Sequence, residues 1–147
     1  MNSKNFTSPG GWFSFTLAVD WKEYNDGEEG TYAFFNYKSW TGNLRITPIR
    51  WKNITDPTED KAEKFIKKRL ATNKQAINIK LGDWDCVHYN KEVKEGDEPF
   101  VVYYWETGKA DSILICSFTI HKERKDSKVN RAELILVQKM IRSITIN

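Results

Sequence analysis

The sequence predicts an α+β protein with a single antiparallel sheet of about six to seven strands, flanked by helices on both faces, in the order βββ-α-ββββ-α. Three observations lead to this prediction. Several segments alternate apolar and polar residues, or are apolar throughout, as strands are. Two segments have apolar residues at helical spacing after residues that cap helices. The connections between the last four strands are as short as turns, which favours antiparallel neighbours because parallel strands need a long crossover.

The first three strands precede the first helix. The stretch FSFTLAVDWKEY alternates apolar and polar residues and then breaks at Trp21, which we expect to pin the turn. The apolar residues that share the core face of this strand are Phe13, Phe15 and Leu17. Two more strand-like segments cover residues 31–37 and 43–51. Pro48 lies in the second segment and has no N–H for a ladder hydrogen bond, so we expect an edge or a bulge there.

The two helices are predicted from their capping residues and their apolar spacing. In DPTEDKAEKFIKKRLATNK we expect Asp56 to cap the N-terminus and Glu59 to complete a capping box. The second helix is expected over roughly residues 128–143. Asn130 and Glu133 offer a second capping box near its start.

Four strand candidates follow the first helix. They cover residues 76–81, 84–93, 99–106 and 112–121. The last two are apolar on both faces, which is typical of strands that are buried on both sides. The residues that we expect to be buried in this sheet are Val101, Tyr103, Leu114 and Phe118. No linker divides the sequence, so residues 1–147 form a single predicted domain.

Two short motifs, one near each end of the sequence, indicate a known family. An aromatic strand leads to Trp21 in FSFTLAVDW, and a short SI segment follows a helix in MIRSITI, residues 140–146. In both features the sequence resembles the PsbP-like domain superfamily, which includes the photosystem II extrinsic protein PsbP, a Ran-binding nuclear import factor and the bacterial DcrB-like lipoproteins. Val19 and Asp20 stand where that family has a proline step before the tryptophan. Within the superfamily the sequence is most similar to the small uncharacterised bacterial members.

The resemblance implies a single PsbP-like domain over residues 1–147 that is used mostly to bind other proteins. The family has no common catalytic residues, so we expect no enzyme. The expected function is a non-catalytic protein-binding module, such as an adaptor, a chaperone or an immunity-type partner. The alternative is a small-ligand binder or an enzyme with a pocket between sheet and helix. A deep pocket with converging polar groups around His88 or His121 would favour that alternative.

The composition narrows the class of partner. The formal net charge of +3 is too small to indicate nucleic acid by itself. Lysines on the first predicted helix are interspersed with acids such as Glu59 and Glu63, so nucleic-acid binding is disfavoured. The sequence has no apolar run near the roughly 18 residues of a membrane span, and its start has no apolar signal core. We therefore expect a cytoplasmic protein that binds no membrane.

The cysteines and histidines indicate neither a metal nor another cofactor. Cys86 and Cys116 lie inside predicted strands and lack CxxC spacing, so we expect free, reduced thiols, with a disulfide between neighbouring strands as the alternative. Cys86 and His88 share a strand face, and a site completed by Cys116 is the metal-binding alternative. A zinc site needs three or four converging ligands, however, and His88 and His121 have no second histidine at ligand spacing. Ordinary strand residues are therefore favoured.

Aromatic residues in NYKSWTGNLRI provide the candidate binding site. Trp40 stands in a predicted turn close to Gly42, where a large ring is difficult to bury. Exposed aromatic residues at loop tips are enriched at binding surfaces. We therefore predict an apolar anchor made by Trp40 and Tyr37, with a polar rim. The rim residues are Lys38, Asn43 and Arg45. The alternative is that Trp40 folds back over the core.

Overall fold

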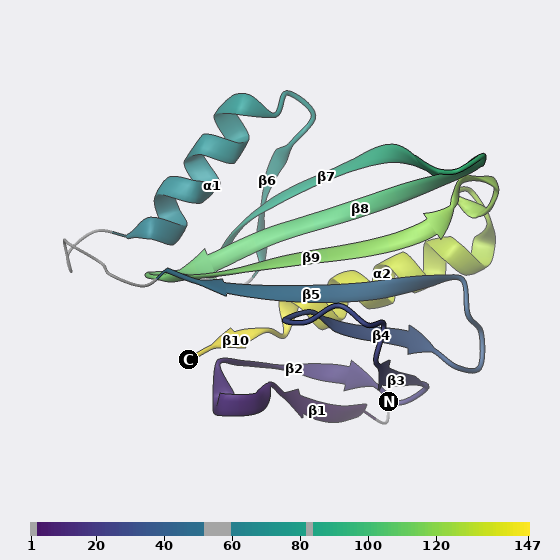
Figure 1. Ribbon diagram of the computed structural model, residues 1–147, viewed down its shortest axis with the longest axis horizontal. Helices are drawn as coiled ribbons and strands as arrows, with labels where there is room; N and C mark the ends of the chain where they lie inside the picture. Colours follow the sequence, from purple (N-terminus) through teal and green to yellow (C-terminus); the bar gives the residue numbers. More distant parts are fainter. Residues whose placement is uncertain (1–2, 52–59, 82–83) are drawn as a thin grey trace.

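The computed structural model describes residues 3–51, 60–81 and 84–147. Ten strands and two α-helices occur in these residues (Figure 1). In chain order they are β1 (Ser3–Thr7), β2 (Phe13–Ala18), β3 (Trp21–Tyr24), β4 (Tyr32–Asn36), β5 (Gly42–Arg50), α1 (Lys61–Thr72), β6 (Ile77–Leu81), β7 (Trp84–Glu95), β8 (Glu98–Lys109), β9 (Ser112–His121), α2 (Lys128–Arg142) and β10 (Thr145–Ile146). Short 3-10 turns follow β1 at Pro9–Gly11 and precede α2 at Lys122–Arg124.

The strands form two sheets, so the prediction of a single sheet flanked by helices on both faces is wrong. The larger sheet has seven strands in the order β3-β4-β5-β9-β8-β7-β6, and the smaller has three in the order β1-β2-β10. Every strand pair in both sheets is antiparallel. Strands contain 52% of the described residues and helices 24%, which makes the protein mostly β and corrects the α+β class.

The correction concerns the partners of β2. The alternation in FSFTLAVDWKEY marks β2 as a strand, but alternation defines two faces and does not say which strands pair. β2 pairs with β1 and β10, which the sequence did not identify as strands. Almost every side chain of β1 is exposed, and β10 is only two residues long, so neither carries an apolar pattern.

One face of the larger sheet is covered by the smaller sheet together with α2 (Figure 1). The core between these layers includes Phe13, Phe15 and Leu17 of β2, Leu44 and Ile46 of β5, Val101 and Trp105 of β8, Cys116 and Phe118 of β9, and Val137 and Ile141 of α2. The predicted burial of Val101, Tyr103, Leu114 and Phe118 is confirmed. Trp21 is fully buried as well, and its ring centroid lies 6.3 Å from that of Phe118.

Helix α1 packs on the opposite face and contacts β7, β8 and β9. It buries Ala62 and Ile66 there, and Arg69 donates hydrogen bonds of 3.0 and 3.1 Å to the two carboxylate oxygens of Glu106. α1 does not cover β3 and β4, which lie at the opposite edge of the larger sheet from β6 (Figure 1). On that part of the face Ala33 is buried, whereas Tyr24 and Phe35 are partly exposed.

The helix caps differ from the predicted ones. Asp60 caps α1 and accepts a hydrogen bond of 2.9 Å from the Glu63 backbone N–H. The predicted cap at Asp56, like Glu59, lies outside the described residues. At α2 the predicted capping box of Asn130 and Glu133 is wrong: Ser127 is the cap and accepts from the Asn130 backbone N–H at 3.1 Å. Asn130 and Glu133 are instead buried, which sequence spacing alone did not indicate.

For Pro48 the sequence predicted an edge or a bulge, and the structure shows a local edge. Pro48 pairs with Leu114 of β9 in a continuous register. The last pair of β5 with β4 is Ile46 with Tyr32, so β5 has no β4 partner at Pro48. The missing N–H therefore costs no ladder hydrogen bond on that side.

Candidate functional site

Trp40 and Tyr37 lie in the turn between β4 and β5, and each is 48% exposed. This exposure favours the predicted surface role of Trp40 over the alternative, in which it folds back over the core. Few large apolar residues among those described are this exposed, and two of them occur in one short turn. Exposed aromatic rings that neighbour one another are a feature of binding surfaces.

The turn is held in place by backbone and side-chain hydrogen bonds. Asn36 ends β4, and its Oδ1 accepts hydrogen bonds of 3.0 Å from the backbone N–H groups of both Lys38 and Ser39. The Tyr37 N–H donates to the carbonyl of Asp20 at 3.0 Å. Gly42 is the first residue of β5. A side chain does not fit there, because a Cβ would lie 2.4 Å from the Thr119 carbonyl oxygen. The turn is thus rigidly connected to both neighbouring strands.

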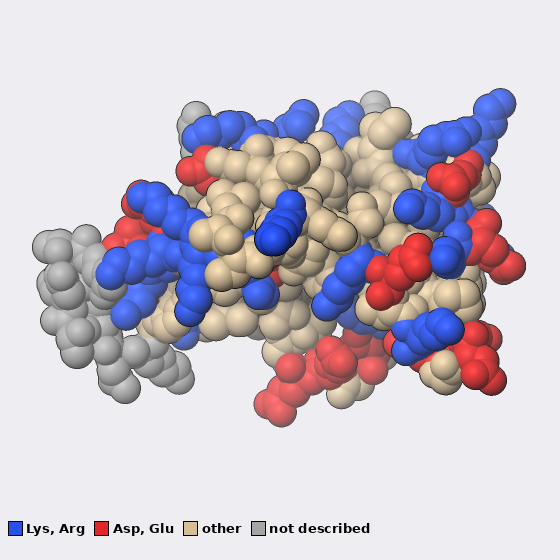
Figure 2. All heavy atoms as spheres, turned by 90° about the horizontal axis from the view of Figure 1, so that it is seen from above, with Lys and Arg blue, Asp and Glu red and all other residues tan. Residues whose placement is uncertain are grey.

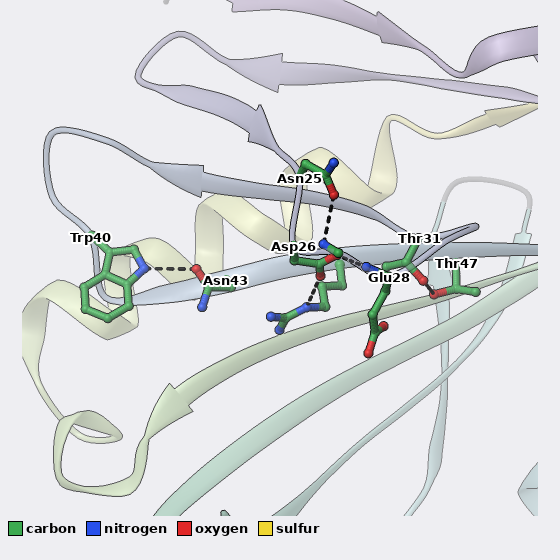
Figure 3. A network of polar contacts seen from close by, with 9 residues as sticks. Asn25, Asp26, Glu28, Thr31, Trp40, Asn43 and Thr47 are labelled. Atoms are coloured by element: carbon green, nitrogen blue, oxygen red, sulfur yellow. Dashed lines mark hydrogen bonds and ion pairs between the residues drawn. The ribbon is translucent and has the colours of Figure 1, made fainter.

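A shallow hollow of about 340 Å³ adjoins this turn. It is lined by Tyr24, Phe35, Trp40 and Asn43. The indole N–H of Trp40 donates to Asn43 Oδ1 at 3.0 Å, and the two side chains face each other in Figure 3. The rings of Tyr24 and Phe35 meet edge to face, with centroids 5.3 Å apart. We call the five residues Tyr24, Phe35, Tyr37, Trp40 and Asn43 the Trp40 surface.

Cations surround the Trp40 surface, and most are already paired. The ammonium of Lys22 lies over the rings of Phe35 and Tyr37, 5.6 and 5.7 Å from their centroids. Lys38 pairs with Asp20 at 3.3 Å. Arg45 pairs with Asp26 at 2.8 Å, and this hydrogen bond lowers the pKa of the Asp26 carboxyl. The rim is therefore polar but largely charge-compensated.

The structure brings together part of the predicted site. Trp40 and Asn43 are in contact, and Tyr37 and Lys38 belong to the same turn. Arg45 lies further along β5, where it donates a hydrogen bond to Asp26, a residue of the turn that precedes β4. Sequence reasoning missed Tyr24 and Phe35. The pair Phe34-Phe35 offered a signal, because neighbouring residues of a strand point to opposite faces and only one can enter the core.

The two cysteines of the metal-binding alternative have surroundings that make their thiols unreactive. Cys86 and Cys116 are buried free thiols. Burial raises the pKa of Cys86 to about 12 and also raises that of Cys116, so neither is a ready thiolate nucleophile. No three His, Cys, Asp or Glu residues within the described ranges are grouped so that they could hold a metal ion. His121 packs against Phe100, whereas His88 lines a pocket beside α2.

The surface charge is mixed. Figure 2 shows Lys and Arg interspersed with Asp and Glu across the face that it presents, without a region of one sign covering it. A phosphate backbone is attracted by a continuous basic stripe, which this face lacks. None of the described helices combines the length and the apolar character that a bilayer crossing requires.

Comparison with known proteins places the chain in a family. The family model described as Domain of unknown function (DUF3805) matches residues 1–146. No curated protein matches the chain significantly. A crystal structure from Bacteroides thetaiotaomicron VPI-5482, at 1.50 Å resolution, is 30% identical with a TM-score of 0.79. The match covers 100% of this chain and 49% of that one, so the chain spans about half the length of this relative.

A second solved structure concerns the predicted resemblance. The solution structure of cyanobacterial PsbP (CyanoP) from Synechocystis sp. PCC 6803 is 12% identical, with a TM-score of 0.47 over 99% of this chain and 92% of that one. A likeness this distant does not establish membership of the PsbP-like superfamily.

Proposed function

For this chain, which belongs to the family Domain of unknown function (DUF3805), we propose from its surface a role as a non-catalytic protein-binding module. The observation that carries the proposal is the half-exposed Trp40 beside an apolar hollow on a rigid turn. Adaptor, chaperone and immunity-type partner are the forms of this function that we expect.

Rigidity favours the proposal because binding then orders few groups. The backbone of the turn is already held by Asn36 and Asp20, and the Trp40 ring by Asn43. Thr41 adds a hydrogen bond to Glu133 of α2. Association costs free energy for each side chain that becomes immobile, so a pre-ordered anchor retains more of its contact energy.

The chemistry of the surface defines the partner. The hollow is apolar. Two of the cations around it are neutralised by Asp20 and Asp26, and Lys22 rests on aromatic rings. A further cation, Arg124, donates a hydrogen bond to the Trp40 carbonyl at 3.5 Å. We therefore propose a protein partner that inserts an aliphatic or aromatic side chain beside Trp40, with polar groups around it. Such anchors typically lose about 2 kcal/mol or more on truncation, roughly a thirtyfold loss of affinity.

The test is capture of a partner from the source cell by the immobilised protein, followed by measurement of its affinity. Trp40→Ala and Tyr37→Ala should each weaken binding of the purified partner. Ile77→Ala is the matched control, because Ile77 is 56% exposed and lies on β6, at the opposite edge of the larger sheet from β3 and β4. A partner that binds Trp40→Ala as tightly as the natural sequence would contradict the proposal, as would an equal loss in the Ile77 variant.

Two finer expectations accompany this proposal. We propose membership of the PsbP-like superfamily on the motifs near the ends of the sequence, and a cytoplasmic location on the two buried free thiols. A solved structure of a nearer PsbP-like relative that superposes on both sheets would support the first. Fractionation of the source cell tests the second.

A further inference from the structure

A second concave site lies between α2 and the strands β7 and β8. It is a pocket of about 540 Å³, a volume within the range of sites that enclose small organic molecules. The sheet wall consists of His88, Tyr103 and Trp105. The helix wall consists of Leu134, Ile135, Gln138, Lys139 and Arg142. This pocket shares no residue with the Trp40 surface.

The sheet wall is aromatic and rigid. The ring centroids of His88 and Trp105 lie 4.9 Å apart with an interplanar angle of 23°, and those of Tyr103 and Trp105 lie 6.4 Å apart at 26°. His88 Nδ1 donates to the carbonyl of Tyr104 at 2.8 Å, since a carbonyl oxygen can only accept. That bond fixes the orientation of the imidazole and leaves its Nε2 available.

The helix wall carries the charge. Lys139 and Arg142 belong to the last turn of α2, and neither forms an ion pair with another described residue. The described residues that line the pocket include no Asp or Glu. A concave site with two uncompensated cations and no carboxylate concentrates anions. Arginine also binds carboxylate-type groups through two parallel hydrogen bonds.

A buried donor lies beside the same pocket. Trp105 is 1% exposed, and its indole N–H has no acceptor among the described residues. Buried donors in proteins nearly always have a partner, because an unpaired one is costly. Because this N–H is inaccessible to solvent, a ligand in the pocket packs against the Trp105 ring and meets its polar partners at the exposed cations of the helix wall.

We propose that this pocket binds a small organic anion, with a carboxylate or sulfonate attached to an apolar ring or chain. The apolar body lies between the aromatic wall and Leu134, and the charged group lies at Lys139 and Arg142. This binding function is independent of the Trp40 surface, so either can fail without the other.

The experiment compares two probes of nearly equal shape, naphthalene-2-carboxylate and its uncharged amide. Titrations are followed by calorimetry and by the indole N–H signal of Trp105 in NMR spectra. We expect saturable binding of the carboxylate that shifts the Trp105 signal, with an affinity about tenfold or more above that of the amide. Binding of neither probe, equal affinities, or shifts at Trp40 in place of Trp105 would overturn the proposal.

Variants locate the site. The double variant Lys139→Gln, Arg142→Gln should remove the preference for the carboxylate. Lys128→Gln, at an exposed position in the first turn of the same helix, should preserve it. Gln138→Trp should block both probes by filling the pocket. Lys128, Lys139 and Arg142 are exposed, so thermal melts should show that these variants fold as the natural sequence does. An equal loss of the carboxylate preference in the Lys128 variant would also overturn the proposal.

Discussion

The hydroxyl of Thr41 donates a hydrogen bond to the carboxylate of Glu133, and both side chains are buried. Thr41 follows Trp40 in the turn, and Glu133 lies on α2, 92 residues further along the chain. Burial raises the pKa of the Glu133 carboxyl to about 7, although the hydrogen bond from Thr41 acts in the opposite direction. The turn that presents Trp40 is thus tied to a carboxyl that titrates near neutral pH.

This carboxyl should make stability depend on pH. Its pKa is about 7 in the folded protein against an ordinary value of 4.5, so between these values the folded state binds more protons than the unfolded state. The free energy of unfolding should therefore fall as pH rises through this interval, by at most about 3 kcal/mol, and then level off. Urea denaturation from about pH 4 to about pH 8 measures this slope.

The variant Glu133→Gln removes the titration. Its stability should change less with pH over the same interval than that of the natural sequence. Glu123→Gln, at an exposed position in the 3-10 turn before α2, is the control and should retain the full slope. An unchanged slope in the Glu133 variant would show that another group is responsible.

Trp40→Ala should leave stability almost unchanged. A half-exposed side chain used for binding contributes little to folding, roughly 0.5 kcal/mol or less, so the melting temperature should move by only a degree or two. The same substitution at the fully buried Trp21 should cost about 3–5 kcal/mol. Thermal melts compare the two variants, and a drop of more than about 10 °C for Trp40→Ala would assign that residue to the core.

The ion pair of Arg69 with Glu106 should stabilise the attachment of α1 to the sheet. Glu106 is 1% exposed, so Arg69→Met leaves a buried carboxylate without its cation. The Arg69 side chain is 43% exposed, which reduces the expected loss to about 1–3 kcal/mol. Adding Glu106→Gln should recover most of this loss.

Chemical denaturation of both single variants and of the double variant gives the coupling between the two residues. The exposed pair of Lys67 with Glu63, 2.8 Å apart on the same helix, is the control, and Lys67→Met should change stability little. Additive losses for Arg69 and Glu106 would rule out a specific contribution of their ion pair.

The two cysteines should resist modification in the folded protein. Cys86 and Cys116 are fully buried, and their raised pKa values keep them protonated at neutral pH. Alkylation should therefore follow unfolding, whereas an added thiol in Ser39→Cys, on the exposed turn, should react at once. Mass spectrometry of alkylated, unreduced protein follows both reactions, and a mass lower by two hydrogens would reveal a disulfide instead.

Part of the candidate site was predictable. Trp40 could be placed in an exposed turn because Gly42 and the neighbouring polar residues interrupt two strand patterns. Tyr24 and Phe35 were harder to assign, because their exposure depends on α1 not reaching β3 and β4. From the sequence, a pocket at His88 could be named only as an observation that would favour a small-ligand binder. Its formation depends on α2 packing over β7 and β8, which brings Lys139 and Arg142 to the pocket.

By itself the sequence determined the local elements: the alternation in β2, the apolar runs of β8 and β9, and the periodic faces of both helices. These patterns depend on the geometry of one segment, in which side chains repeat every two or every 3.6 residues. Only the tertiary structure decided that β2 pairs with β1 and β10, that Glu133 bonds to Thr41, and that Glu106 receives Arg69. Each of these contacts joins segments that are distant in the chain or that lack an apolar pattern. The free energy that favours them is gained only when the layers pack together.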